Sequence, residues 1–115
     1  MAVKFKLLKE GEEHCVLWDV MVPVPVDGGF EQRLLKVRFM VTGIDEYLAA
    51  LGDGATANEV LKKVIVDLPE LEQEGREGFA AFTPELLNRL LNFNYVSRAL
   101  HNAYLDCING RAAKN

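Results

Sequence analysis

Apolar and polar residues alternate through much of the first 41 residues, and this period of two predicts β-strands. The clearest alternation covers residues 16–26, where every second position carries valine or tryptophan. Residues 30–41 continue the pattern, with apolar side chains at every second position from Leu35. A shorter alternating stretch at residues 3–8, followed by a turn at Gly11, predicts one more strand. The first 41 residues are therefore expected to be mostly β.

Asp27-Gly28-Gly29 separates the two longer stretches and supplies residues that tolerate the positive φ of a hairpin turn. Pro23 and Pro25 both fall on the less apolar face of the first stretch. Because proline has no N–H to donate, we expect this part of the strand to lie at a sheet edge or to end the pairing. The predicted hairpin has one apolar and one mixed face, so helices are expected to cover the apolar face.

From residue 42 the apolar period becomes helical. Residues 44–51 predict a short helix that ends at Gly52-Asp53-Gly54. Thr56 and Glu59 have the spacing of a capping box, which predicts the start of a second helix. We expect Pro69 to end this second helix. Its predicted apolar stripe consists of Val60, Leu61, Val64, Ile65 and Leu68.

The last third of the chain predicts two more helices. Residues 70–82 are acidic and irregular, and Thr83-Pro84 is a typical helix start. A break at residues 92–94 precedes a final helix that Gly110 should stop, and residues 111–115 are expected to form a flexible tail. The expected fold class is α+β: one domain over residues 1–115, with an N-terminal antiparallel β-hairpin or small sheet (1–41) followed by about four α-helices packed on it (42–110).

The charge and the lengths of the apolar runs indicate which kinds of partner this protein is not expected to bind. The formal net charge is −4 and no basic face is apparent, so nucleic acid is not an expected partner. No apolar run approaches the roughly 20 residues of a spanning helix, so no membrane partner is expected either. The N-terminal residues lack an apolar signal core, and we expect a cytoplasmic protein with two reduced thiols, Cys15 and Cys107.

The residues that carry chemistry do not form a recognised catalytic pattern. His14 with Cys15 and His101 with Cys107 lack metal-ligand spacing, so no metal or other cofactor is expected. Ser97 is the single serine and lies inside a predicted helix, and no phosphate-binding Gly-Lys-Ser/Thr sequence occurs. The chain is therefore expected to be a binding protein and not an enzyme.

A longer series of signals resembles a known family. It comprises the strand Val-Leu-Trp-Asp-Val-Met-Val-Pro-Val-Pro-Val, the turn Asp-Gly-Gly, the helix start Phe-Thr-Pro-Glu-Leu-Leu at residues 82–87, and the final helix with Val-Ser-Arg-Ala-Leu-His-Asn-Ala-Tyr at 96–104. This order, over nearly the whole chain, resembles the tail assembly chaperones of long-tailed, siphovirus-like bacteriophages. The sequence departs from that family at residues 64–66, because its members tend to carry a tryptophan in the middle helix.

The resemblance implies a role in building the phage tail. Such chaperones keep the tape measure protein soluble in the host cytoplasm, help to recruit the major tail tube protein, and are absent from the mature virion. Many also exist as a longer frameshifted form, through which the tube protein can be bound. One possible encoding of residues 113–115, Ala-Lys-Asn, is GCA-AAA-AAC, which contains the slippery heptamer A-AAA-AAC.

The mechanism that the resemblance implies is reversible binding of apolar stripes on the client, in a groove or at a sheet edge. Many weak sites along one client, together with weak self-association, would suit this role. Four aromatic residues near predicted breaks are the expected contacts, although core packing would also account for them: Phe79, Phe82, Phe93 and Tyr95.

Two other functions fit the same sequence. A head–tail connector or tail terminator subunit would form a stable ring and remain in the virion. A bacterial adaptor or regulatory module would lack tail genes beside its own.

Overall fold

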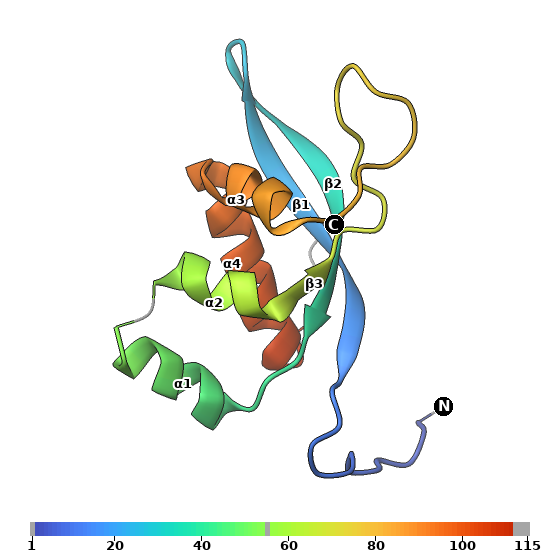
Figure 1. Cartoon of the computed structure of the whole chain (residues 1–115), viewed down its shortest axis with the longest axis vertical. Coiled ribbons are helices and arrows are strands. Elements are labelled where there is room, and N and C mark those ends of the chain that lie inside the picture. Colours follow the sequence, from blue (N-terminus) through green and yellow to red (C-terminus); the bar gives the residue numbers. More distant parts are fainter. Residues whose placement is uncertain (1, 55, 112–115) are drawn as a thin grey trace.

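The computed structural model describes residues 2–54 and 56–111, and it confirms the expected α+β class. Two long strands open the chain, and four helices follow, with a short third strand between the second and third helices (Figure 1). The sheet is antiparallel and has the order β1-β2-β3. The elements are β1 (Cys15–Val26), β2 (Gly29–Met40), α1 (Ile44–Gly52), α2 (Ala57–Val64), β3 (Ile65–Asp67), α3 (Pro84–Leu91) and α4 (Asn94–Ile108).

The β1–β2 hairpin forms with the expected turn. Pairing runs without a shift from Val26↔Gly29 to Cys15↔Met40, so Asp27 and Gly28 are the two turn residues. Gly28 has a φ of 81°, a conformation that glycine adopts without steric cost. The turn therefore fixes which side chains of the two strands share a face.

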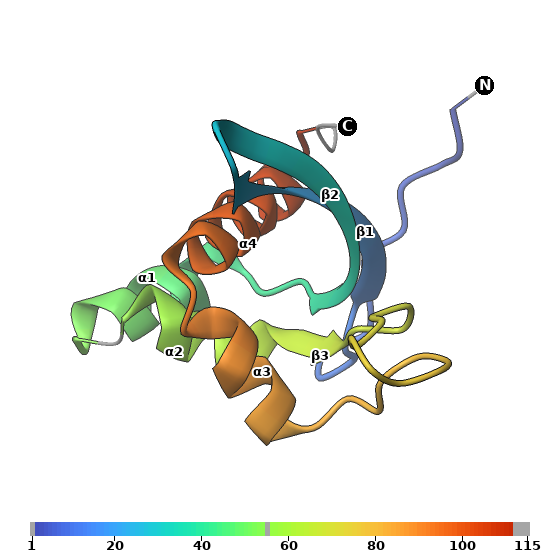
Figure 2. The same ribbon diagram turned by 90° about the horizontal axis from the view of Figure 1, so that it is seen from above.

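The hairpin curves around α4, as the view from above shows (Figure 2). Its concave face supplies Val20, Val22, Val37 and Phe39 to the core, which confirms that helices cover the apolar face. The ring of Phe39 lies 5.3 Å from the ring of Tyr104 on α4. The Tyr104 hydroxyl also hydrogen-bonds the Thr42 hydroxyl at 2.6 Å and donates to the Met40 carbonyl oxygen at 3.3 Å. Tyr104 thus joins α4 to the end of β2 through both its ring and its hydroxyl.

The second helix ends earlier than the sequence predicts. It was expected to continue to Leu68, but α2 ends at Val64. Residues 65–67 instead form β3, which pairs with the edge of β2 opposite to β1. Val64, Ile65 and Val66 are β-branched, so a helix restricts their side chains while a strand accommodates them. All five residues of the predicted stripe are nevertheless buried, because the strand continues toward the same core.

The predicted helix ends form at several positions. The hydroxyls of Thr56 and Thr83 accept the N–H groups of Glu59 and Leu86 at 3.2 and 3.1 Å, which caps α2 and α3. At the end of α4, Gly110 has a φ of 72° and closes a Schellman motif. In this motif the backbone N–H of Gly110 donates to the carbonyl oxygen of Cys107 at 3.4 Å. The backbone N–H of Arg111 donates to the carbonyl oxygen of Asp106 at 2.8 Å. Residues 112–115 of the predicted flexible tail, and with them the Ala-Lys-Asn sequence, lie outside the described residues.

The strand predicted at residues 3–8 is wrong. Residues 2–9, called the N-terminal arm below, form no ladder, and Figures 1 and 2 show them leading away from the sheet. Val3, Phe5 and Leu7 are 93%, 88% and 86% exposed. Alternation gives a segment two distinct faces, but a strand forms only where another strand supplies hydrogen-bond partners. The expected turn does form, because the Glu12 N–H donates to the Lys9 oxygen at 3.0 Å.

The irregular stretch at residues 70–82 is confirmed as a loop, with one isolated bridge between Glu72 and Phe79. Among the described residues, no helix combines the length and the apolar character needed to cross a membrane.

Candidate binding groove

The outer edge of β1 is not paired with any strand in the described part of the chain. The N–H of Val41 donates to the His14 oxygen at 2.7 Å, which makes these two residues a hydrogen-bonded pair just beyond the end of the ladder. Such pairs alternate along an antiparallel ladder. Following the register, the even-numbered residues of β1 bond to β2, and the odd-numbered residues direct their N–H and C=O groups outward.

Pro23 and Pro25 are both odd-numbered, so the donors that they lack belong to the outer edge. The ladder with β2 keeps all of its donors, and pairing continues past both prolines to Val26. Of the two outcomes expected for this segment, the sheet edge is confirmed. The outer edge can donate hydrogen bonds at residues 15–21, whereas the two prolines prevent donation nearer the turn.

A groove of about 570 Å³ lies between this edge and α4. One wall comes from β1 and includes Trp18, Val20 and Met21. The other wall comes from α4, where Ala99 and Ala103 stand one turn apart and are partly buried. The polar side chains of α4 along the groove are Arg98, Asn102 and Asp106. The small alanines leave room for an apolar side chain, and the polar residues can fix its neighbours.

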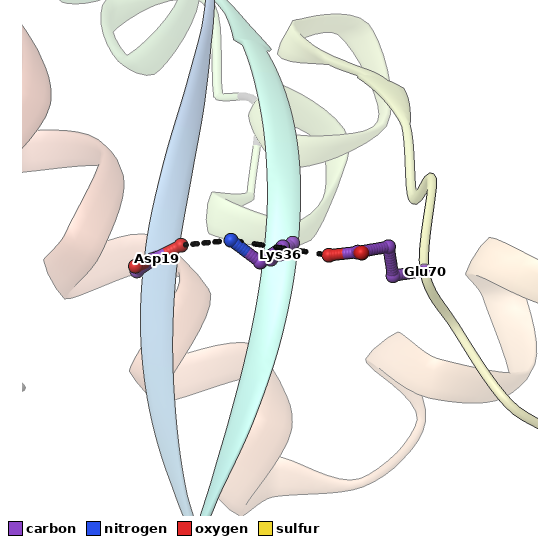
Figure 3. Close-up of polar contacts among 3 residues, drawn as sticks. All are labelled: Asp19, Lys36 and Glu70. Atoms are coloured by element: carbon purple, nitrogen blue, oxygen red, sulfur yellow. Dashed lines mark hydrogen bonds and ion pairs between the residues drawn. The ribbon is translucent and has the colours of Figure 1, made fainter.

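A row of alternating charges crosses the convex face of the sheet and ends at this edge (Figure 3). Lys36 Nζ on β2 lies 3.3 Å from Asp19 Oδ1 on β1 and 3.8 Å from Glu70 Oε2 in the loop. The three side chains are 32%, 40% and 49% exposed. Partly exposed pairs of this kind add little stability. The row ends with the carboxylate of Asp19, which would face the side chains of any strand added to the outer edge of β1.

The four aromatic residues proposed as partner contacts lie in two places. Phe93 and Tyr95 flank the start of α4, with ring centroids 5.7 Å apart. Phe93 is 50% exposed, and Tyr95 is partly buried and lines the groove. Phe79 is 60% exposed in the loop before α3, and Phe82 packs partly buried against the core. Phe79 lines a separate hollow together with Arg76 and Leu86, and this hollow shares no lining residue with the groove.

The sequence did not reveal the β1 wall or the alanines as one surface. Both belong to amphipathic elements, and only the way in which α4 lies across β1 brings them together. One signal in the sequence did indicate the open edge of β1, namely the spacing of the two prolines from the hairpin turn. Their odd-numbered positions already place both missing donors on the same edge.

The side chains that could carry chemistry are dispersed. His101 Nε2 lies 3.0 Å from the Tyr47 hydroxyl, and burial lowers the pKa of His101. Cys15 and Cys107 are free, and burial raises the pKa of the Cys107 thiol, which favours its unreactive protonated form. In residues 2–54 and 56–111 no three His, Cys, Asp or Glu side chains are grouped so that they could hold a metal ion.

Comparisons with protein-family models, with curated proteins and with solved structures give no match to this chain.

Proposed function

We propose that this protein is a tail assembly chaperone of a long-tailed bacteriophage. In this proposal it binds the tape measure protein in the host cytoplasm and keeps it soluble. It also helps to recruit tail tube subunits, and leaves before the virion is complete. The observation that supports the proposal best is the groove between β1 and α4, with the exposed Phe93 and the partly buried Tyr95 at the start of α4. Exposed aromatic side chains beside an apolar-floored groove are typical of surfaces that bind other proteins.

The groove suits a client with an apolar stripe. An apolar side chain can enter over Ala99 and Ala103, because these residues let a partner backbone approach closely. The ring of Tyr95 can cover the next side chain along the stripe, and Arg98 and Asn102 can bond polar neighbours. Such a contact is small, so each copy would bind weakly and release readily. Many copies along one client would then supply the overall affinity.

The experiment is co-expression of this protein with the tape measure protein encoded beside it. Solubility and co-purification of the client are measured for the wild type, Phe93→Asp and Phe79→Asp. The control is Phe30→Asp, because Phe30 is also exposed but lies near the hairpin turn, outside the groove. Circular dichroism and thermal melting establish that each variant folds.

We expect Phe93→Asp to abolish rescue of the client and Phe30→Asp to preserve it. Loss of rescue by Phe79→Asp alone would move the client site to the loop before α3. If the client stays insoluble with the wild type while this protein forms a closed ring, the chaperone function is rejected in favour of a connector or terminator subunit.

A further inference from the structure

We propose that the N-terminal arm of one copy of this protein adds as a fourth strand to the outer edge of β1 in a second copy. The arm and the edge are both unpaired in the described structure, and they match in side-chain pattern, charge and length. This inference concerns only two copies of this chain and stands without the client proposed above, although the arm and that client would compete for the same groove.

The arm carries two faces as soon as it is extended. Val3, Phe5 and Leu7 point to one side of a strand, and Lys4 and Lys6 point to the other. The three apolar side chains are almost fully exposed in the single chain, at 86–93%. Burial of such side chains is favourable, at about 1.5–3 kcal/mol for each fully buried residue. The arm therefore has an exposed apolar face whose burial against another surface would be favourable.

The outer edge of β1 accepts both faces of the arm at once. On the concave side an added strand would lie beside Trp18 and Val20, across the groove from the alanines of α4. This side suits the apolar face of the arm. On the convex side, a side chain of the added strand would lie beside Asp19, at the end of the row of charges. A lysine there extends the order Glu70, Lys36, Asp19 with a fourth charge of alternating sign.

Side-chain alternation also excludes half of the alternative registers. A slip of one residue would direct Lys4 and Lys6 into the groove and expose Phe5 on the convex face. Registers of this kind are disfavoured because they desolvate the lysines in the groove and leave the apolar face of the arm in water. Among the remaining registers, the one that pairs residues 2–8 with the whole segment from Cys15 to Met21 places Lys4 or Lys6, according to strand direction, beside Asp19.

The lengths of arm and edge agree. The edge offers outward N–H and C=O groups from Cys15 to Met21, and residues 2–8 of the arm span the same seven positions. Pro23 and Pro25 prevent donation beyond this segment. An added strand therefore has a defined end on the side of the hairpin turn.

A second copy is the occupant because the arm leads away from its own sheet. The arm, which precedes the turn at Lys9–Glu12, runs outward from its own sheet (Figures 1 and 2). Its apolar side chains Val3, Phe5 and Leu7 are 86–93% exposed, so they contact little of their own chain. Each copy offers one arm and one edge, so two copies can exchange arms reciprocally. Such an exchange closes on itself as a symmetric pair.

The test is sedimentation velocity of the full chain over a series of concentrations from micromolar to near-millimolar. We expect a concentration-dependent dimer for the wild type. Phe5→Asp should weaken it by at least about tenfold, because the apolar face loses its central residue. Leu17→Pro should weaken it similarly, because it removes one outward donor and leaves the ladder with β2 intact. Leu48→Asp, on the exposed face of α1, is the matched control and should dimerise as the wild type does.

Mixing the two defective variants separates arm exchange from a general loss of association. Phe5→Asp copies keep an intact edge and Leu17→Pro copies keep an intact arm, so a mixed pair keeps one unaltered arm–edge contact, whereas a pair of either variant alone keeps none. The mixture should therefore associate more tightly than either variant does with itself. A wild type that stays monomeric at every concentration would overturn the inference. So would undiminished association of Phe5→Asp and Leu17→Pro. Monomers whose Leu17 and Asp19 amides are protected from hydrogen exchange would show that the arm pairs with its own β1 instead.

Discussion

The two faces of the β1–β2 hairpin are built from neighbouring residues and have opposite environments. On the concave face Val20, Val37 and Phe39 are at most 3% exposed. On the convex face Leu17, Phe30 and Leu34 are 44%, 67% and 53% exposed. Apolar character alone therefore does not locate the core of this protein. The side on which α4 packs decides which apolar residues stabilise the fold and which remain available to partners.

The largest expected effect compares one phenylalanine on each face. Phe39→Ala should lower the free energy of unfolding by about 3–5 kcal/mol, because it removes a fully buried ring and leaves a cavity beside Tyr104. Phe30→Ala should change it by no more than about 0.5 kcal/mol, because that ring is already in water. Urea denaturation monitored by circular dichroism measures both. Similar losses of stability for the two variants would mean that the two faces contribute equally to the fold.

A second comparison concerns the backbone of β1 at neighbouring positions. Val20 donates to β2 and Met21 directs its N–H outward, so proline should be tolerated at 21 and not at 20. We expect Val20→Pro to destabilise the protein by about 1–3 kcal/mol more than Val20→Ala does, through the lost ladder bond. Met21→Pro should cost clearly less than Val20→Pro in the same urea titration. The reverse order would mean that the even-numbered residues face outward.

A smaller effect should follow from the hydroxyl that joins α4 to the end of β2. Tyr104→Phe keeps the ring against Phe39 and removes the hydrogen bonds to Thr42 and Met40. We expect a loss of about 1 kcal/mol, because Thr42 can recover part of its hydrogen bonding from water. Thermal melting measures the loss, and Tyr95→Phe is the control, since Tyr95 packs at the start of α4. No change in Tyr104→Phe would mean that ring packing alone joins the two elements.

The smallest expected effect is a dependence of stability on pH through His101. Burial holds the pKa of His101 below 6.5, so below that pH the unfolded chain binds the proton more readily than the folded chain does. The contribution of His101 to stability is therefore complete above pH 6.5 and is lost progressively as the pH falls below it. Melting temperatures measured from neutral pH to about pH 5 should fall less steeply for His101→Gln than for the wild type. Parallel curves would show that His101 takes no part in the dependence.

Much of the fold could be predicted because local signals agreed with the tertiary structure. The turn at Asp27-Gly28 fixed the register of the hairpin, and Thr56, Thr83 and Gly110 marked helix ends that the structure confirms. Two predictions failed for a common reason. The arm has the period of a strand without a neighbour to pair with, and β3 has the apolar spacing of a helix but lies beside β2. In both cases the available hydrogen-bond partners decided the outcome, and these are not visible along one segment.

The candidate site was predicted only in part. The predicted breaks indicated four aromatic residues as partner contacts. The structure places Phe93 and Tyr95 beside the groove and Phe79 in another hollow, and it packs Phe82 partly buried against the core. The walls of the groove come from residues that are 70 to 90 positions apart in the chain. Their proximity depends on the angle at which α4 crosses β1, which no periodicity in either element specifies.

The placement of Pro23 and Pro25 also bears on how this protein behaves when it is abundant. A twelve-residue strand with a fully open edge could nucleate fibres, because each added strand offers a new edge of equal length to the next. The two prolines leave donors on little more than half of that edge, so the template is short. A cell making many copies of this chain at once would thereby be protected from cross-β precipitation, without any change to the packed side of the sheet.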